Sequence, residues 1–524
     1  MTSRRKVLGL IAGGAAGLAV PAASAAYAHW TKESAGRILN SRIALPAPFA
    51  VPLPTPPRAR PVRGTRTTDH YELTQRAAPV EILPGTRTTV WGYDGIFPGP
   101  TITARSGRTV SVNVLNSLTV PTSTHLHGGV TPPHSDGYPT DVVVPALCGD
   151  TFRAGRMQRR GHGMHTAASD WTVSQGAKTY EYPLKQRAAT LWYHDHRMDF
   201  SAPQVWRGLA GFFLVHDAEE DALPLPDGDR DLPLMLCDRS FEADGSFRYP
   251  GHDLGCTGTP GVQDAYMDGV LGDVQLVNGA PWPEAEIPAT RHRLRLLNAS
   301  NARRYHLRWE LDSGGTLPLV QIGGDAGLLG ASQRLDAIPM APAERFDVVT
   351  DFSRCPVGSH VTLVNTLAEG RMRQVMRFRI ARRAKDDSHV PARLSSYAPL
   401  APSTAVTTRH FDFRRTEDRW TINGRPFDAA ATLARPRLGT VERWRLSSDF
   451  HHPVHLHLAH FQVLSRGGRP PRATDAGWKD TVDVRPYEVV EVLARFDGHR
   501  GRYMLHCHNL EHEDMAMMAN FEVV

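Results

Sequence analysis

The sequence predicts an all-β protein built from three related β-sandwiches. From about residue 66 to the C-terminus, short β-branched and apolar runs alternate with Gly, Pro and Asn turns, and no long helical period stands out. The chain holds 45 Gly and 40 Pro, in keeping with many turns. Its 524 residues are too many for one ordinary core and suit three domains.

An internal repeat supports the three copies. Alternating strands that end in Asn or Ser turn residues occur at 109–117, 293–300 and 442–448. A second matching run follows near the end of each copy, at 189–196, 361–366 and 503–508. Repetition at roughly 150–190 residues implies three related sandwiches. The second run carries histidines in the first and third copies and none in the middle copy.

The N-terminus predicts export. A twin arginine, Arg4 and Arg5, precedes a Gly/Ala-rich apolar run that ends in small residues near Ala25 and Ala28. This is the pattern of a twin-arginine signal, so we predict that residues 1–28 are removed and that the mature chain is secreted or periplasmic. No other stretch reaches 18 uninterrupted apolar residues, and we predict no membrane anchor.

The rest of the chain divides into a strap and three domains. The Pro-rich residues 29–65 predict an extended strap. Strand patterns are interrupted near residue 218 and again near 385–402, where charged and Pro/Ser-rich residues intervene. We therefore predict domains at 66–218, 219–390 and 391–524.

Composition narrows the functional class. The net charge of +6 and a pI near 9.1 come from scattered arginines without a basic helix or a base-stacking motif, so we do not predict a nucleic-acid partner. Outside the histidine-rich C-terminal region there are four cysteines. In an oxidising compartment these form up to two disulfides, or they stay buried free thiols. They are Cys148, Cys237, Cys256 and Cys355.

Histidines are the compositional anomaly, with 25 in the chain. Residues i and i+2 of a strand point to the same face, so a His-x-His pair presents both imidazoles to one site. Two such pairs lie near each end of the chain. They are His125 and His127, His194 and His196, His455 and His457, and His506 and His508.

A second donor set surrounds Cys507. His512 and Met517 follow it by five and ten residues, and His452 supplies the second imidazole. Two imidazoles, a thiolate and a weak thioether form an electron-transfer copper site, and eight paired imidazoles suit a cluster of three metal ions. Cys507 faces one way along its strand while its neighbours face the cluster. Single electrons accepted at the Cys507 site can therefore pass to the cluster and be delivered together to an acceptor that needs several electrons. Dioxygen, which needs four, is the natural acceptor.

These motifs, His-x-His-Gly, His-x-His, His-Pro-x-His-x-His and His-Cys-His-x₃-His-x₄-Met, resemble the four copper motifs of the multicopper oxidases over residues 100–518. The resemblance implies three cupredoxin-like Greek-key β-sandwich domains and four copper ions. It assigns type 1 copper to His452, Cys507, His512 and Met517, type 2 copper to His125 and His455, and the type 3 pair to His127, His194 and His508 and to His196, His457 and His506.

Within the family, the His125-Leu-His-Gly-Gly-Val-Thr-Pro run and Leu-Trp-Tyr-His-Asp-His look most like the branch of bacterial spore-coat laccase, bilirubin oxidase and phenoxazinone synthase. In that branch, acids matching Asp136 and Glu513 help to deliver protons, and reducing O₂ to water consumes protons. The alternative role of each is a carboxylate that only orients an imidazole. The family spacing favours Met517 as axial ligand, with Met515 and Met518 as rivals.

Residues 141–180 depart from that branch because this stretch is longer than expected. A long loop in a compact domain is usually functional or disordered. It covers a substrate opening or binds an extra copper, or it is only a solvated basic insertion. It carries several basic, histidine and methionine residues, among them Arg153, Arg156, Arg159, Arg160, His162, Met164 and His165.

The resemblance implies a laccase-like oxidase that takes single electrons from a small phenolic or aminophenolic donor, with an imidazole edge of His512 or His452 facing the substrate. O₂ is then reduced to water at the cluster. A metal-ion oxidase acting on Cu(I), Mn(II) or Fe(II) is the alternative, although the 13 methionines do not gather as a cuprous oxidase requires. A copper-binding or structural coat protein is the non-enzymatic alternative. The sequence does not indicate an oligomeric state.

Overall fold

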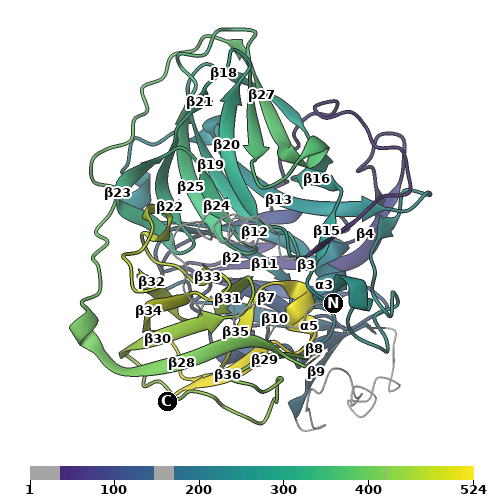
Figure 1. The fold of residues 1–524 in the computed structure, drawn as a ribbon, viewed down its shortest axis with the longest axis vertical. Coiled ribbons are helices and arrows are strands. Elements are labelled where there is room, and N and C mark those ends of the chain that lie inside the picture. Colours follow the sequence, from purple (N-terminus) through teal and green to yellow (C-terminus); the bar gives the residue numbers. More distant parts are fainter. Residues whose placement is uncertain (1–35, 147–169, 418) are drawn as a thin grey trace, which may run out of the picture. The chain divides into compact units, whose positions relative to one another are not determined.

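Strands carry almost all of the regular structure in the computed structural model of the protein, which describes residues 36–146, 170–417 and 419–524 (Figure 1). Within these residues the α-helices are short: α3 (Ser201–Trp206), α4 (Ala218–Asp221) and α5 (Leu510–Asp514). None of the helices in this part of the chain is long and apolar enough to cross a bilayer. The all-β prediction is confirmed.

The first segment forms two sheets over a shared core. One has the order β10-β6-β3-β2 with β4 paired to β3, and the other has the order β5-β12-β11-β7. Alternate residues of β6, such as Val112, and residues of β11, such as Leu191, meet in one buried cluster, as the alternating pattern predicts. The strands are β2 (Arg63–Gly64), β3 (Thr68–Val80), β4 (Thr88–Tyr93), β5 (Gly99–Arg105), β6 (Thr109–Asn116), β7 (Thr124–His127), β10 (Ala177–Tyr182), β11 (Ala189–Asp195) and β12 (Ala210–His216).

The middle segment repeats this plan with larger sheets. Their orders are β17-β16-β13-β19-β25-β22-β23, with β14 on β13, and β18-β27-β26-β20-β21, with β24 on β20. Leu294, Trp309 and Phe378 meet in its core. The strands are β13 (Asp231–Phe241), β14 (Phe247–Arg248), β16 (Val274–Val277), β17 (Ala280–Pro281), β18 (Glu284–Pro288), β19 (Arg291–Asn298), β20 (Tyr305–Leu311), β21 (Thr316–Leu317), β22 (Leu319–Gly324), β23 (Gly327–Leu335), β24 (Ile338–Met340), β25 (Arg345–Asp351), β26 (His360–Asn365) and β27 (Gln374–Arg382).

The third segment has sheets of order β29-β28-β30-β34-β32 and β33-β31-β35-β36. Leu446, Val482 and Leu505 pack between them. Helix α5 follows β35 and lies beside α3, whose first amide groups donate to the Asp514 carboxylate (Figure 1). The strands are β28 (Ala405–Thr416), β29 (Arg419–Ile422), β30 (Val441–Ser448), β31 (His452–Leu456), β32 (His460–Arg466), β33 (Thr481–Val484), β34 (Val489–Arg495), β35 (Gly501–Cys507) and β36 (Met518–Val523).

Three related sheet pairs therefore follow one another along the chain, as the internal repeat implies. Before them, residues 36–62 contain strand β1 (Arg37–Leu39), which pairs in parallel with β15 (Val270–Gly272), and isolated bridges from Pro52 to Glu284 and from Arg58 to Thr101. Short 3₁₀ turns join several strands: η1 (Pro133–Ser135), η5 (Gly228–Arg230), η6 (Asp264–Tyr266), η7 (Gly370–Arg373), η8 (Pro402–Thr404) and η9 (Ala473–Asp475). The domain boundaries stay predictions.

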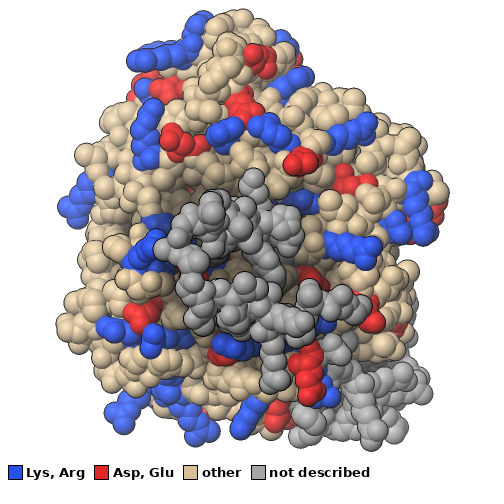
Figure 2. All heavy atoms as spheres, viewed as in Figure 1, with Lys and Arg blue, Asp and Glu red and all other residues tan. Residues whose placement is uncertain are grey.

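Buried ion pairs join the segments. Arg293 of the middle segment contacts both Glu220, which follows the first pair of sheets, and Asp347. Two guanidinium nitrogens of Arg345 donate to the two carboxylate oxygens of Asp480 in the third segment, and both side chains are almost fully buried. Such pairs fix the docking of sheets because each charge, once buried, needs its opposite. On the face drawn in Figure 2, lysine and arginine are interspersed with aspartate and glutamate.

Two predictions concern residues that the structure covers only in part. Strands β8 (Asp141–Val144) and β9 (Thr172–Gln175) pair in parallel and bring the ends of the 141–180 stretch together. Its Arg153–His165 residues, the twin-arginine signal and Cys148 all lie outside the described residues. Cys237, Cys256 and Cys355 are buried free thiols, so the alternative with two disulfides is wrong.

Candidate metal centres

Three donor atoms of the predicted mononuclear set converge in the third segment. The Nδ1 atom of His452 lies 3.3 Å from the Cys507 sulfur and 3.1 Å from Nδ1 of His512. The Cys507 sulfur and Nδ1 of His512 are 3.6 Å apart. These separations suit ligands about 2.0–2.3 Å from one ion. His452 opens β31, Cys507 ends β35 and His512 lies in α5, so two paired strands and the helix that follows them position the set.

Met517 lies on the same side of the sheet as this set. The Cys507 amide donates to the Met517 carbonyl, and the Met517 amide donates to the His512 carbonyl, which closes the chain into a loop around Cys507. Met517 and Met515 share the buried cluster of Cys507, whereas Met518 packs in a different cluster. This arrangement favours Met517 over Met518 as the fourth ligand.

The imidazoles of this set are covered. His452 and His512 are both 0% exposed, so the expectation that one of their edges faces a substrate directly is wrong. Trp420 stacks on His512 with ring centroids 3.8 Å apart, and Nε2 of His512 donates to the Asp268 carbonyl over 3.2 Å. The Asp268 side chain, in contrast, is 51% exposed and lies 3.4 Å from Arg415.

The eight paired histidines form one buried cluster between the first and third segments. Strand register brings them together: His194 lies opposite His125 where β11 pairs with β7, and His455 lies opposite His506 where β31 pairs with β35. All eight are at most 1% exposed, and they are His125, His127, His194, His196, His455, His457, His506 and His508.

The Nε2 atoms of three rings face one another inside this cluster. Nε2 of His506 lies 3.3 Å from Nε2 of His196 and 3.2 Å from Nε2 of His457. In His457 and His506 the Nδ1–H group donates to an oxygen, of Asp136 and of the Cys507 backbone, so their Nε2 atoms carry lone pairs. The lone pairs of His457 and His506 repel at this distance unless a cation lies between them. Together with the adjacent Nε2 of His196, these rings fit a metal ion.

A second pair shows the same arrangement. Nε2 of His125 and Nε2 of His455 are 3.5 Å apart, while the Nδ1 atoms donate to the Asp136 and Asp480 carbonyls. The remaining three rings have buried nitrogens without a hydrogen-bond partner in the described protein: Nδ1 of His127, Nε2 of His194 and both nitrogens of His508. Buried polar atoms are almost always satisfied, and a metal ion would satisfy these.

Burial also keeps the imidazoles in the form that binds metal. It lowers the pKa of His194 to about 3 and holds the pKa of His125, His127 and His455 well below the usual range, because a charged ring loses its hydration there. A neutral imidazole is the ligand form. Burial raises the pKa of the Cys507 thiol, and a bound metal ion would favour its thiolate.

Both predicted carboxylates lie against one group of three histidines. Oδ2 of Asp136 accepts from His457 over 2.7 Å, and burial raises the pKa of Asp136 to about 7. The Glu513 oxygens lie 3.2 Å from Nδ1 of His506 and 3.4 Å from Nδ1 of His196, as close contacts rather than aligned hydrogen bonds. The two acids are fully buried, so each contacts cluster imidazoles without facing solvent.

Asp480 is a site residue that sequence reasoning missed. Its Oδ1 atom lies 3.0 Å from Nε2 of His127, and its backbone carbonyl accepts from His455. Although burial raises its pKa, Arg345 holds the pKa of this carboxyl well below its usual range. No motif marks Asp480, and both His127 and Arg345 lie far away in sequence. Trp420 and Asp268 were missed for the same reason.

Comparisons with known proteins agree with this geometry. Family models described as multicopper oxidase match residues 74–154, 153–220 and 397–524. A laccase of Bacillus subtilis is 33% identical over 91% of this chain and 98% of its own length, and a bilirubin oxidase of Albifimbria verrucaria is 34% identical over 90% and 81%. The solved laccase of Pediococcus acidilactici superposes with a TM-score of 0.78 at 30% identity, covering 93% of this chain and 96% of its own.

Proposed function

The chain belongs to the multicopper oxidase family and is an oxidoreductase that uses O₂, and we propose that its electron donors are small phenolic or aminophenolic aromatics and that O₂ is reduced to water. Copper would supply the one-electron acceptor at the Cys507 site and the place of O₂ reduction at the cluster. Two of its relatives are named for oxidases of this kind, a laccase and a bilirubin oxidase, which supports an aromatic donor.

The observation that carries the proposal is the tripeptide His506-Cys507-His508. Cys507 belongs to the mononuclear set, His506 meets His196 and His457, and His508 meets the orphaned rings of His127 and His194. A few covalent bonds therefore join the place where single electrons enter to the place where several are needed. A protein that only stores copper would need no such connection. The alternative of a copper-binding or structural coat protein is set aside because the family consists of oxidases.

We assign the twelve predicted ligands to four copper ions. The type 1 ion would be held by the mononuclear set together with Met517, and the facing Nε2 atoms support the two groups they link. The sets are His452, Cys507, His512 and Met517 for type 1, His125 and His455 for type 2, and His127, His194 and His508 with His196, His457 and His506 for type 3.

Asp136 and Glu513 are proposed to deliver protons. Reduction of O₂ to water consumes four protons, and the cluster is closed to solvent. The two carboxylates are in direct contact with cluster imidazoles, and a carboxylate next to the reacting oxygen is the usual general acid. Asp480 is given a different role, since it is held by Arg345 and lies against Nε2 of His127, which it orients.

The cover of His512 determines how a donor reaches the type 1 site. Because neither imidazole edge is exposed, we propose that the aromatic donor rests against the half-exposed side chain of Asp268. Electrons would then pass to His512 through the Asp268 carbonyl or through the buried indole of Trp420 that stacks on it. The exposed Asp268 carboxylate also favours the alternative of a cationic donor such as Cu(I), Mn(II) or Fe(II). Its ion pair with Arg415 offsets that charge.

Oxygen uptake by the copper-loaded protein tests the proposal. We expect uptake with 2,6-dimethoxyphenol and an o-aminophenol and little with Cu(I), Mn(II) or Fe(II), after the intense blue absorption of a Cys-ligated copper has been verified. Uptake with the metal ions alone would establish the metal-ion oxidase. A blue protein that takes up no oxygen with any donor would contradict the function.

We further propose that the twin-arginine route exports the protein, because Arg4 and Arg5 precede an apolar run with small residues at its end. Replacing both by lysine is expected to retain the full-length precursor inside the cell. Immunodetection of the mature chain in extracytoplasmic fractions checks this, and unchanged export of the double variant would contradict it.

A further inference from the structure

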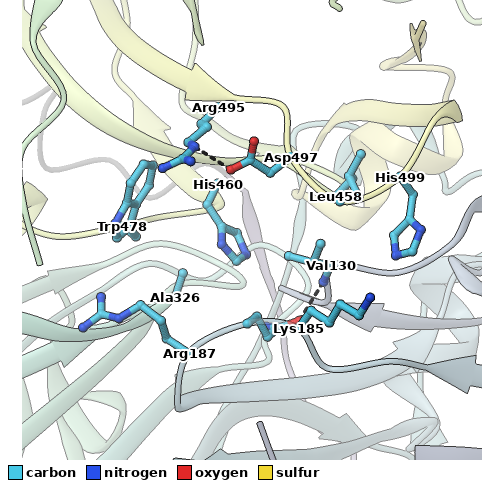
Figure 3. Close-up of a pocket in the computed structure, with 12 residues that line it drawn as sticks. Val130, Lys185, Arg187, Ala326, Leu458, His460, Trp478, Arg495, Asp497 and His499 are labelled. Carbon is cyan, nitrogen blue, oxygen red and sulfur yellow. Dashed lines mark hydrogen bonds and ion pairs between the residues drawn. The ribbon is translucent and has the colours of Figure 1, made fainter. Parts of the chain in front are cut away.

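A cavity of about 270 Å³ opens where the three segments meet, away from the mononuclear set (Figure 3). We call it the junction pocket. Residues of the first segment, Lys185 and Arg187, lie on one side, and residues of the third segment, Trp478 and Arg495, lie on the other. Its wall also includes Val130, Ala326, Leu458, His460, Asp497 and His499.

The charges around the junction pocket are unbalanced. Three permanent cations line it against one carboxylate, Asp497, and that carboxylate is already paired with Arg495 over 2.5 Å. Lys185 is exposed and has no hydrogen bond or ion pair to another described residue, and it extends beneath His499 in Figure 3. The pKa of His499 is lowered, first by burial and then by repulsion from Lys185.

Arg187 adds an unused donor. Its Nη2 atom donates to the Leu328 carbonyl over 3.2 Å and lies 3.6 Å from Glu219. Its Nη1 atom is buried without a hydrogen-bond partner in the described protein. A buried guanidinium nitrogen normally finds an acceptor, and a carboxylate matches the planar fork of arginine.

The other walls are apolar and aromatic. Trp478 is half-buried and closes one side of the pocket, and Leu458, Val130 and Ala326 supply aliphatic surface. Ligand sites typically combine such surface with a few polar groups, and drug-sized sites begin at about 300 Å³. The volume here therefore suits a single ring rather than a polycyclic molecule.

The floor of the pocket is tied to the copper cluster. The Gly128 carbonyl accepts from Nε2 of His460 over 3.1 Å and from the Gln186 amide over 2.9 Å, and the Val130 amide donates to Gln186 over 2.7 Å. Gly128 directly follows His127. His460 and Trp478 likewise lie three and two residues from His457 and Asp480.

We propose that the junction pocket binds a small aromatic carboxylate, with its ring against Trp478 and its carboxylate between Lys185 and Arg187. Such a ligand would act on the cluster end of the molecule through Gly128 and His460, and not on the mononuclear site. Only this coupling rests on the proposed function, because binding itself needs no copper and no turnover.

Isothermal titration of the copper-loaded full chain with sodium benzoate tests the proposal. Benzoate has no phenolic hydroxyl and is not an electron donor, so failure of the proposed oxidase function would leave this measurement intact. We expect one site per chain, at least a tenfold loss of affinity in the Lys185→Gln/Arg187→Gln variant, and weaker binding as salt rises. The control variant, Lys385→Gln, removes an exposed cation outside the pocket and is expected to bind normally.

Each further arm has a defined outcome. Trp478→Leu is expected to weaken benzoate and to leave any binding of inorganic phosphate unchanged, and equal affinity for the two anions would overturn the aromatic assignment. If the double variant unfolds, Lys185→Glu alone serves, because Lys185 makes no hydrogen bond or ion pair to another described residue that the change would break. Unchanged benzoate binding in these variants would overturn the site. An unchanged type 2 EPR signal on saturation with benzoate would overturn the coupling.

Discussion

The mononuclear set and the eight-histidine cluster are held in different ways. Three donors of the mononuclear set, His452, Cys507 and His512, come from two neighbouring strands and the short helix that follows them. The cluster takes four imidazoles from the first segment and four from the third, and one of its contacts, Asp480, depends on Arg345 of the middle segment. One site is therefore local, whereas the other exists only when three segments are docked.

The middle segment contributes to both sites, in different ways. It contributes no imidazole to either predicted ligand set, yet it supplies Arg345 beneath the cluster and the Asp268 carbonyl over His512. A segment without ligands thus controls both the docking of one site and the cover of the other.

The largest effect is expected from Cys507→Ser. This change removes the thiolate of the mononuclear set and leaves the eight imidazoles in place, so one copper is lost, the blue absorption disappears and oxygen uptake falls to background. Copper analysis and visible spectroscopy check this. Retention of all four ions, or of substantial uptake, would mean that electrons do not enter through Cys507.

Arg345→Leu is expected to separate the two sites. It leaves Asp480 charged and unpaired in a fully buried position, which costs about 3–5 kcal/mol of unfolding free energy. Denaturant unfolding measures the loss, and in the folded protein the type 2 EPR signal should weaken while the blue absorption remains. The control is Arg379→Gln, in an exposed pair with Glu286, with a cost below about 1 kcal/mol. Loss of the blue signal first would contradict the contrast.

Asp136→Asn is expected to slow oxygen uptake by about 10²-fold. Its side chain contacts His457 of the cluster and none of the mononuclear donors, so anaerobic reduction of the blue copper should keep its rate. Stopped-flow absorbance distinguishes the two steps. An equal slowing of both would show a general structural defect and would remove the proton-delivery role.

Glu220→Gln tests a junction that touches neither site. Burial raises the pKa of Glu220, but Arg293, His216 and Arg295 outweigh this and hold it well below its usual range. A lowered carboxyl pKa stabilises the fold above the unfolded value of about 4.3 and loses that contribution as pH falls further. We expect a loss of about 2 kcal/mol at pH 7 that shrinks below pH 4. Thermal melts across pH check this, and a constant difference would contradict it.

The smallest effect is expected from Trp420→Leu. Removing the ring stacked on His512 should slow reduction of the blue copper by an aromatic donor several-fold, while the reoxidation of the cluster by O₂ is unchanged. Trp420→Phe is the matched control because it keeps an aromatic ring there. Identical reduction rates in the wild type and the leucine variant would exclude the indole as an electron route.

The sequence predicted the candidate ligands better than it predicted the residues that contact them. His-x-His spacing is a local property, and the eight imidazoles that it singles out lie in one buried cluster. Counting the remaining donors grouped Cys507 with His452 and His512, whose donor atoms converge, while copper binding by these residues stays a prediction. Asp480, Trp420 and Asp268 carry no such pattern, because each acts through a contact made only after distant segments dock. The expected exposed edge of His512 failed for that reason: its cover comes from a loop more than 200 residues away.

The most direct test of the central claim is the ratio of donor molecules oxidised to O₂ consumed, measured together with hydrogen peroxide. If Cys507 passes single electrons to an intact cluster, four one-electron oxidations of 2,6-dimethoxyphenol should accompany each O₂, without peroxide. Two oxidations per O₂ with an equivalent of hydrogen peroxide would contradict the account, because the cluster would then not complete the reduction to water.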